Sequence, residues 1–381
     1  MRLPALPTGR QAQAGISEYG VEMLIIELSG SHYEMGQQHG QKLLQYRPAL
    51  LGLISDYEKK TREYFDKGMP AMVDEISRIL QVHSPQTLDM MDGIADSFEI
   101  SRGDILSMMM GSYIEDRLAP LPGLSFQEDG CTSWSISKEK ARQDKVLLAK
   151  NRDYLVSHRQ MQVIFRCKPA GGHQYLSLNS IGACNVFSSG INADGLVIAD
   201  TRVPSIDIGP GLPRFSLMMH ILENFQFVNE VINYLRSIPR MGGGNLIFAD
   251  AKGGMGRAEI GYEDLGILQE STGFLVCTNH FEHPLMQKKY RKRNETEEKD
   301  SKWRFEKVSE SLLANGEKMD SDLAAKLMAY HDERFAICRH GDSKPLDETS
   351  TISSAIFLPE RRGFYFCEGF PCTDSFRWIS F

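Results

Sequence analysis

The sequence predicts an α+β protein in which helices cover stacked sheets, and three observations carry this prediction. Apolar residues recur at helical spacing through most of the first third of the chain, from about residue 31 to residue 118. Short runs with the two-residue period of strands follow from residue 131 onward. Two helical stretches, at about residues 215–238 and 302–330, interrupt these strands. This order of elements favours sheets sandwiched by helices.

The first third begins with a loose tail of about fifteen residues and a predicted strand. The strand covers Val21 to Ser29, which is rich in aliphatic and β-branched residues. Ser31 and Glu34 have the spacing of a capping box, so we expect a helix to begin directly after the strand. Further helix starts are predicted at Ser84-Pro85 and at Ser101-Arg-Gly-Asp104.

Residues 118–130 (LAPLPGLSFQEDG) have no period and contain two prolines and two glycines, which predicts a loop. In CTSWSIS, which follows, Trp134 and Ile136 alternate with serines in the period of a half-buried strand. The charged stretch KEKARQDK turns the chain, and VLLAKN returns as the partner strand. TISSAIFLPERRGFYFCEG predicts a closing hairpin. The charge-dense residues 288–307 are interpreted as a solvated loop that leads into a helix.

Composition limits the function classes. With 381 residues the chain suits one large domain or two ordinary ones. A formal net charge of −7 gives no global attraction to nucleic acid or anionic lipid, and no apolar run is long enough to cross a bilayer. The N-terminus lacks the apolar core of a secretory signal, and the seven cysteines form no even framework and no CxxC. We therefore expect a cytoplasmic protein with reduced thiols.

Cys131 is the first candidate for chemistry. It follows Gly130 where the loop meets the strand, and glycine permits the strained backbone of a peptide bond about to rearrange. A thiol can attack the preceding carbonyl, and hydrolysis would leave Cys131 as a new N-terminus whose α-amine serves as base for its own thiol. The alternative is a buried structural cysteine at a strand start.

Asp153 ends the strand that pairs with the one after Cys131, so the hairpin brings the two back together. A carboxylate there can hold an α-ammonium, and Lys150 or Arg152 can favour the thiolate. The alternative is an ordinary Asp/Arg pair at a strand end.

Two asparagines are further candidates. Asn279 lies at a predicted strand end, where its side-chain amide could stabilise an oxyanion. Asn192 lies in Asn-x-Asp-Gly, which is first of all a hairpin turn and second a polar group for the site. His280 and His283 have no further ligand at useful spacing, so we predict no metal and no bound cofactor.

Together these pieces resemble the acyl-coenzyme A:6-aminopenicillanic-acid acyltransferase-like (isopenicillin N acyltransferase-like) family of N-terminal-nucleophile hydrolases. Eight segments, in register along the chain, are similar to motifs of that family: Leu28-Ser-Gly-Ser-His-Tyr-Glu-Met-Gly-Gln-Gln-His-Gly40, Gly130-Cys-Thr-Ser133, Asn151-Arg-Asp153, Gly190-Ile-Asn-Ala-Asp-Gly-Leu196, Cys277-Thr-Asn-His-Phe281, Ser301-x-x-Arg304, Ala336-Ile-Cys-Arg-His340 and Glu368-Gly-Phe-Pro-Cys372. Lys150 stands where bile-salt-hydrolase relatives place an Arg, and Ala336 stands where the family often has Ser.

The resemblance implies a four-layer αββα sandwich and self-cleavage between Gly130 and Cys131. Residues 1–130 would form a mostly helical propeptide, and residues 131–381 would form the catalytic segment that keeps it bound. Cys131 is implied as the nucleophile, Asp153 as its orienting carboxylate and Asn279 as an oxyanion group, with Asn192 and Arg304 as weaker candidates. The substrate would be an acyl-amide, acyl-amino acid or peptide, with acyl-coenzyme A as a co-substrate of a transferase. Association into a homo-oligomer is compatible with this interpretation.

Two other classes stay open at the level of sequence. One is a Cys-His thiol peptidase that does not cleave itself, which would need His158, His280 or His283 beside Cys131. The other is a non-catalytic binding relic of the fold. The presence of Cys131, Asp153 and Asn279 in one chain argues against the relic.

Overall fold

The computed structural model describes residues 23–65, 69–118, 130–142, 145–292, 295–315, 318–332, 336–340 and 349–381. The N-terminal tail and most of the loop expected at 118–130 lie outside these residues. In the first third, the structure contains β1 (Ile25–Gly30), α1 (His32–Lys42), α2 (Arg47–Phe65), α3 (Met69–His83), α4 (Pro85–Phe98), α5 (Arg102–Met109) and α6 (Gly111–Leu118). The capping box at Ser31 is confirmed. The strand predicted over Val21 to Ser29 is confirmed from Ile25, with its first two residues outside the described part of the chain.

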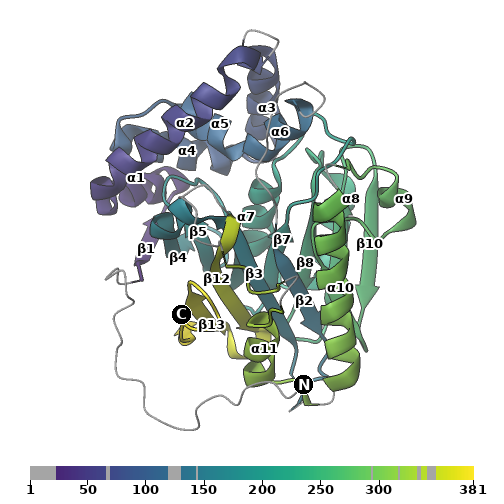
Figure 1. Ribbon diagram of the computed structural model, residues 1–381. Coiled ribbons are helices and arrows are strands. Elements are labelled where there is room, and N and C mark those ends of the chain that lie inside the picture. The colour runs from purple at the N-terminus through teal and green to yellow at the C-terminus, as the bar shows by residue number, and fades with distance from the viewer. Residues whose placement is uncertain are drawn as a thin grey trace.

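The remainder is built mainly of strands (Figure 1). Its elements are β2 (Thr132–Ile136), β3 (Leu147–Leu155), β4 (Gln162–Pro169), β5 (Tyr175–Ser180), β6 (Ser189–Asn192), β7 (Val197–Thr201), α7 (Arg214–Asn224), α8 (Val228–Ser237), β8 (Gly244–Ala249), β9 (Met255–Ile260), β10 (Leu265–Glu270), β11 (Phe274–Cys277), α9 (Pro284–Gln287), α10 (Glu295–Asn315), α11 (Ser321–Met328), β12 (Thr349–Leu358), β13 (Gly363–Glu368) and β14 (Arg377–Ser380).

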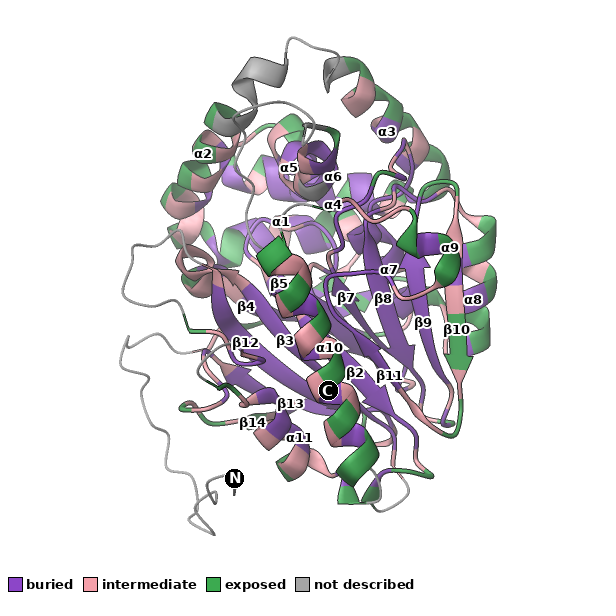
Figure 2. Cartoon of the chain, turned by 45° about the vertical axis from the view of Figure 1, so that its right-hand side comes forward, coloured by how far each residue is buried: buried purple, intermediate pink, exposed green. Residues whose placement is uncertain are grey.

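These strands form two sheets that face each other. One has the order β1-β4-β5-β6-β7-β8-β9-β10 and the other β11-β2-β3-β12-β13-β14. A buried apolar cluster joins the inner faces, with Leu148 and Phe357 from the second sheet packed among Ile164 and Val197 from the first. Most strand residues are buried, as Figure 2 shows.

Helices cover both outer faces, so the expected four-layer αββα architecture is confirmed. The helices α1–α8 share one core with the eight-stranded sheet, to which Met35, Leu217 and Phe248 contribute. On the other side α10 and α11 pack on the six-stranded sheet, where Val308 and Leu327 contact the cluster around Trp134. Among the described residues, no helix combines the length and the apolar character needed to span a membrane.

β2 differs from the half-buried strand that its alternation predicted. Trp134 and Ile136 face the helical layer as expected, but Ser133 and Ser135 are also fully buried. They lie on the opposite face of the strand, which points to the eight-stranded sheet instead of to solvent. A strand that is covered on one face by helices and on the other by a second sheet has no solvent-exposed face.

The two long helical stretches each prove to be two helices. At residues 215–238 the break falls between α7 and α8, where the backbone N–H groups of Gln226 and Phe227 both donate to the Glu230 carboxylate. At residues 302–330, Asp320 caps a new helix by accepting from the N–H of Leu323. Caps of this kind satisfy donors that a continuous helix would use internally.

The first third is joined to the rest by a strand as well as by helices. β1 pairs in parallel with β4, from Ile25 opposite Ile164 to Gly30 opposite Pro169. His39 of α1 is fully buried, and its Nε2 accepts from the N–H of Gly182 at 3.0 Å. Burial lowers the pKa of His39 to about 3. The Leu28–Gly40 motif therefore fixes α1 against the eight-stranded sheet.

Candidate active site

The pairing of β2 with β3 brings Cys131 beside Asp153. Thr132 lies opposite Asn151, so Cys131 is adjacent to the next positions of β3. The Cys131 thiol lies 3.7 Å from the backbone carbonyl of Asp153, to which it donates. Burial raises the pKa of the Cys131 thiol, and the charge of Lys150 opposes that shift. The hairpin prediction for these two residues is confirmed.

Asp153 keeps one carboxylate oxygen without a hydrogen-bond partner among the described residues. Its Oδ1 accepts from the Thr351 hydroxyl at 2.7 Å, whereas its buried Oδ2 has no partner. A bulge in β12 between Thr351 and Ser353 aims Thr351 at this carboxylate. Burial raises the pKa of Asp153 to about 6, although Arg339, Thr351 and Arg304 act to lower it. The group therefore titrates near neutral pH.

Gly130 lies against the free oxygen of Asp153. A Cβ at position 130 would be 2.8 Å from Asp153 Oδ2 and 2.5 Å from Nη1 of Arg339. Those distances are too short for any side chain, so only glycine fits without displacing Arg339. The residue before Cys131 is thus held between a carboxylate and a guanidinium.

Arg304 of α10 connects the backbone of Cys131 with Asn279. The Arg304 side chain is fully buried, and one Nη donates to the Cys131 carbonyl at 2.7 Å and to the Thr132 hydroxyl at 3.1 Å. The other Nη donates to Oδ1 of Asn279 at 2.9 Å, and Nε pairs with Asp300 at 3.0 Å. Five guanidinium donors in a fixed fork suit this many acceptors.

Asn279 follows β11 and is oriented by this contact. Its Nδ2 donates to the Arg202 carbonyl at 2.8 Å, and its backbone N–H donates to the Ser301 hydroxyl at 2.9 Å. An amide nitrogen carries two hydrogens, so one donor of Asn279 is free of these contacts. Cys131, Asp153, Asn279 and Arg304 thus form one cluster, together with Gly130.

Asn192 belongs to another part of the fold. Its Nδ2 donates to the carbonyls of Leu222 and Phe225, and its Oδ1 accepts from the N–H groups of Asp194 and Leu196. These four bonds use the whole capacity of the amide. They tie the β6–β7 turn to the end of α7, which agrees with the hairpin-turn interpretation. An oxyanion role for Asn192 stays a prediction that would require one of these bonds to break.

Lys150 and Arg152 lie on the face of β3 that looks toward the other sheet. Lys150 pairs with Asp200 at 2.7 Å, and Arg214 pairs with the same carboxylate at 2.9 Å. Arg152 is almost fully buried and donates to the Asn179 carbonyl and the Ser180 hydroxyl. It forms no ion pair with any described carboxylate, and burial lowers its pKa. Lys150 and Arg214 thus share the carboxylate of Asp200, and the charge of Lys150 acts on the Cys131 thiol.

The three histidines considered as partners of Cys131 have other contacts. Nδ1 of His280 lies 2.8 Å from the Ser301 hydroxyl, and its Nε2 lies 2.9 Å from Glu282. His283 accepts from the N–H of Leu285 at the start of α9. Burial lowers the pKa of His158 to about 3, and its ring packs edge-on against Tyr154. These contacts give no support to a Cys-His pair.

Sequence reasoning missed Arg339 and Thr351. Arg339 lies 3.7 Å from Asp300 and contacts the position of Gly130, and its backbone N–H donates to the Thr351 hydroxyl at 2.8 Å. Arg339 is the centre of the Ala336–His340 motif, so a signal for it was present. Thr351 lies in a strand of alternating small residues and carried no signal. Sequence reasoning also missed a group of His331, His340 and Cys372, whose ligand atoms lie within 4.8 Å of one another and could hold a metal. The sulfur of Cys338 lies 3.6 Å from that of Cys372.

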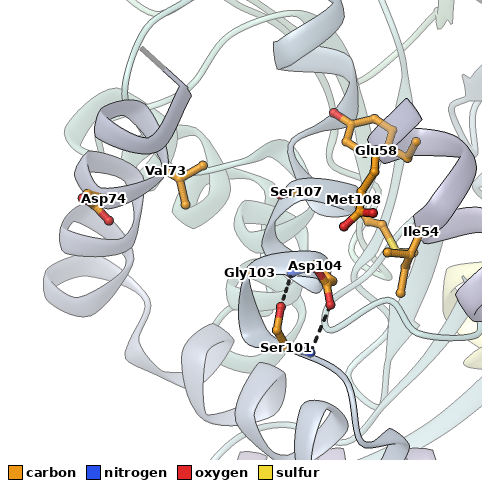
Figure 3. A pocket seen from close by; sticks show the side chains of 10 residues that line it. Ile54, Glu58, Val73, Asp74, Ser101, Gly103, Asp104, Ser107 and Met108 are labelled. Carbon is orange, nitrogen blue, oxygen red and sulfur yellow. Dashed lines mark hydrogen bonds between the residues drawn. The ribbon is translucent and has the colours of Figure 1, made fainter. Parts of the chain in front are cut away.

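A cavity of about 350 Å³ lies away from this cluster. Its lining comes from α2, α3, α5 and the segment before α5, and includes Ile54, Val73, Ser101 and Met108. Figure 3 shows it beside the capping box at the start of α5, where Ser101 and Asp104 exchange hydrogen bonds. Its lining contains none of the candidate residues. The cavity is therefore a feature of the helical layer.

The chain is similar to a known protein family and to a protein of another organism. The sequence model of the family described as acyl-coenzyme A:6-aminopenicillanic acid acyl-transferase matches residues 140–372, more than half of the chain. This range includes Asp153, Asn192, Asn279 and Arg304 and begins after Cys131. An uncharacterized protein of Archaeoglobus fulgidus is 20% identical over 392 residues, covering 91% of this chain. The chain spans 63% of the length of that relative.

Two solved structures are similar in fold. A mutant of conjugated bile acid hydrolase from Clostridium perfringens is 14% identical, with a TM-score of 0.47 over 66% of this chain and 97% of that one. Penicillin V acylase from Agrobacterium tumefaciens is 17% identical, with a TM-score of 0.45 over 66% of this chain and 86% of that one.

Proposed function

Because the chain belongs to the acyl-coenzyme A:6-aminopenicillanic acid acyltransferase family, we propose that it is a self-cleaving enzyme that hydrolyses or transfers acyl groups through Cys131. Cleavage between Gly130 and Cys131 would divide it into residues 1–130 and 131–381. Cys131 would then be an N-terminal nucleophile that needs no metal and no bound cofactor for this reaction.

The observation that carries this proposal is the free oxygen of Asp153. A buried carboxylate oxygen without a partner is costly, so it calls for a donor. It faces Gly130, directly before the bond to be cut. Cleavage creates an α-ammonium on Cys131 at this place, and an ion pair with Asp153 would satisfy both groups. This unpaired oxygen supports the proposal, because Asp153 would receive the α-ammonium that cleavage forms.

Arg304 and Asn279 support the second half of the mechanism. Arg304 holds the Cys131 carbonyl and fixes the Asn279 amide, whose remaining N–H is proposed to stabilise the oxyanion. The Cys131 thiolate attacks an acyl carbonyl, an S–C bond forms, and the C–N bond of an amide breaks as the α-ammonium protonates the leaving amine. Water or an acceptor amine then attacks the thioester, loses its proton to the α-amine and releases Cys131.

The buried cations near Cys131 support an anionic substrate. Arg152 has no described carboxylate partner, whereas Lys150 and Arg214 are both paired with Asp200. A buried guanidinium without a carboxylate partner is well suited to bind a carboxylate or a phosphate group of a substrate. An N-acyl amino acid or acylated peptide would supply the first, and acyl-coenzyme A would supply the second. We propose Arg152 as the residue that binds this group.

Denaturing mass spectrometry of the purified wild-type chain, beside Cys131→Ala, tests self-cleavage. Wild type is expected to give fragments of 130 and 251 residues, and Cys131→Ala to give the intact chain. An intact wild-type chain that stays intact on incubation would contradict the proposal. That result would favour a Cys-His peptidase or a non-catalytic binding relic of the fold.

The same preparation tests the substrate class. Wild type is compared with Arg152→Met on an N-acyl amino acid and on its neutral carboxamide. Wild type is expected to favour the acid by roughly 10-fold or more in kcat/KM, and Arg152→Met to lose this preference while it still turns over the carboxamide. If Arg152→Met keeps the preference for the acid, then Arg152 does not bind the substrate. The proposal of self-cleavage at Cys131 would be unaffected by that result.

A further inference from the structure

Two cysteines and two histidines from separate parts of the chain meet on the surface beside α11. His331 follows α11, Cys338 and His340 lie on the next segment, and Cys372 lies in the turn after β13. We refer to these four as the sulfur–imidazole cluster. Cys338 is buried, Cys372 is partly exposed and both histidines are exposed, so solvent reaches the cluster. None of the four has a part in the mechanism proposed above.

The Cys338–Cys372 and Cys338–His340 distances are close to those between ligands of one tetrahedral ion, and the Cys372–His340 distance is about 0.6 Å shorter than such an edge. The sulfur atoms of Cys338 and Cys372 lie 3.6 Å apart, and Nε2 of His340 lies 3.6 Å from the first and 3.0 Å from the second. Zinc bonds of ordinary length imply edges of about 3.8 Å between two sulfurs and about 3.6 Å between sulfur and nitrogen. A ring nitrogen of His331 lies within 4.8 Å of the ligand atoms of His340 and Cys372.

Local structure holds three of these side chains in place. The backbone N–H groups of Ile337 and Cys338 both donate to the carbonyl of Tyr330, and His331 forms a β-bridge with Ala336. The ring of His340 stacks on Phe370 at 4.2 Å with an angle of 9°. Phe370 donates its N–H to Asp374, which fixes the turn that carries Cys372. The cluster is therefore set by contacts beyond its own members.

We propose that the sulfur–imidazole cluster binds one Zn²⁺ ion through Cys338, His340, Cys372 and His331. Two thiolates and two imidazoles are a donor set that suits zinc, and four protein ligands are typical of a structural site. His331 is exposed, so its ring can turn to complete the set. A disulfide between Cys338 and Cys372 would account for neither histidine.

The site would act on the segment that carries Arg339. Arg339 lies between two of the ligands, and its guanidinium borders Gly130 and approaches Asp300. Its backbone N–H donates to Thr351, which in turn donates to Asp153. Zinc would tie this segment to the β13 turn and hold Arg339 at the bond between Gly130 and Cys131. The binding site itself does not depend on the proposed function.

Metal titration of the full chain tests the site. The Cys131→Ala protein is stripped with a chelator and titrated with Zn²⁺ alone and with Co²⁺ alone, because this background removes the nucleophilic thiol as a competing ligand. We expect roughly one equivalent of zinc per chain, and a cobalt spectrum with thiolate charge-transfer bands and tetrahedral d–d bands. Cys372→Ser and His340→Gln should weaken binding at least about 10-fold.

Two control variants and two contrary outcomes show whether the zinc site is specific to the sulfur–imidazole cluster. Cys184→Ser, at a buried thiol elsewhere, and His83→Gln, at an exposed imidazole in α3, should bind zinc like the parent. Zinc binding that is equal in parent, Cys372→Ser and His340→Gln would overturn the proposal. An intact mass two hydrogens lower, restored by reductant and linked to Cys338 and Cys372, would replace the metal site with a disulfide. His340→Gln is exposed, so misfolding would not explain its loss of metal.

Discussion

The two helical layers of this protein differ in what they bury. The helices α1–α6, which belong to the layer over the eight-stranded sheet, contribute mainly apolar side chains to its core, and Gly36 and Gly93 lie at the crossing of α1 and α4. The layer of α10 and α11 buries Ser301 and a fully enclosed Arg304 against the start of β2. Both layers cover a sheet, and the second supplies Arg304, which donates directly to the Cys131 carbonyl.

This difference separates two tasks within one architecture. Apolar packing with close helix contacts gives stability and a fixed position. Burial of a guanidinium costs desolvation energy, and it is stable here because four acceptors surround Arg304. Variants in the second layer should therefore change chemistry first, and variants in the first layer should change stability first.

Arg304→Met is expected to have the largest effect. It leaves the Cys131 carbonyl, the Asn279 amide and Asp300 without their shared donor. Self-cleavage and acyl transfer should each fall at least about 100-fold, and the free energy of unfolding should drop by about 3–5 kcal/mol. Fragment formation, thioester turnover and urea denaturation measure the three quantities. Lys302→Met, at an exposed residue of the same helix, should change none of them. If Arg304→Met cleaves itself at the normal rate, then α10 has no part in the cleavage reaction.

Asp153→Asn should reduce activity and raise stability. The pKa of Asp153 is about 6 in the folded chain and ordinary in the unfolded chain, so the folded state binds this proton more tightly. The favourable contribution is complete below about pH 4 and is lost as the pH rises through about 6. Asparagine carries no charge, so the variant should gain on the order of 3 kcal/mol over its parent at about pH 8 and nothing at about pH 4.

The stability of Asp153→Asn is measured by denaturation in the Cys131→Ala background, where both chains stay intact. Cleavage, measured with Cys131 present, should fall at least about 100-fold. In wild type, cleavage should rise with pH through about 6 as Asp153 ionises. A variant that is less stable than its parent at every pH would show that the buried carboxylate is well paired in the uncut chain.

Gly36→Ala is expected to have the smallest effect on chemistry. A Cβ at position 36 would meet the Met90 carbonyl and come within 2.9 Å of the Ile94 nitrogen. The free energy of unfolding should fall by about 1–3 kcal/mol, while the fraction of chains cleaved stays that of wild type. Gly52→Ala in α2 is the control, because nothing lies within 4 Å of its Cβ. It should be neutral or stabilising by about 0.5–1 kcal/mol. A cleavage defect specific to Gly36→Ala would link the first layer to catalysis.

The sequence allowed much of this fold to be predicted because its local signals agree with one another. The capping box at Ser31 and the hairpin between β2 and β3 depend on neighbours in the chain, and both were predicted. The burial of Ser133 was not predicted, because it depends on a second sheet that no local pattern records. The breaks after α7 and α10 were missed for a related reason, since side chains of Glu230 and Asp320 cap the new helices.

The site shows the same limit. Cys131 and Asp153 were expected to meet because one hairpin carries both. Arg304 entered only through the family resemblance, since nothing near it in sequence indicates a contact 173 residues away. The sulfur–imidazole cluster was missed because its members come from three segments and two of them face solvent. Spacing along a chain predicts ligands only when one turn or hairpin supplies them.

The pairing of β1 with β4 has a consequence for assembly. A chain cut after Gly130 would hold a strand of one product inside the main sheet of the other. Unfolding would then release two molecules from one, and refolding would become bimolecular and slower on dilution. The order of events would be fixed, with folding first and cutting second. The native fold of the cut enzyme would therefore depend on its having folded as a single chain, and thermal unfolding would not be readily reversed.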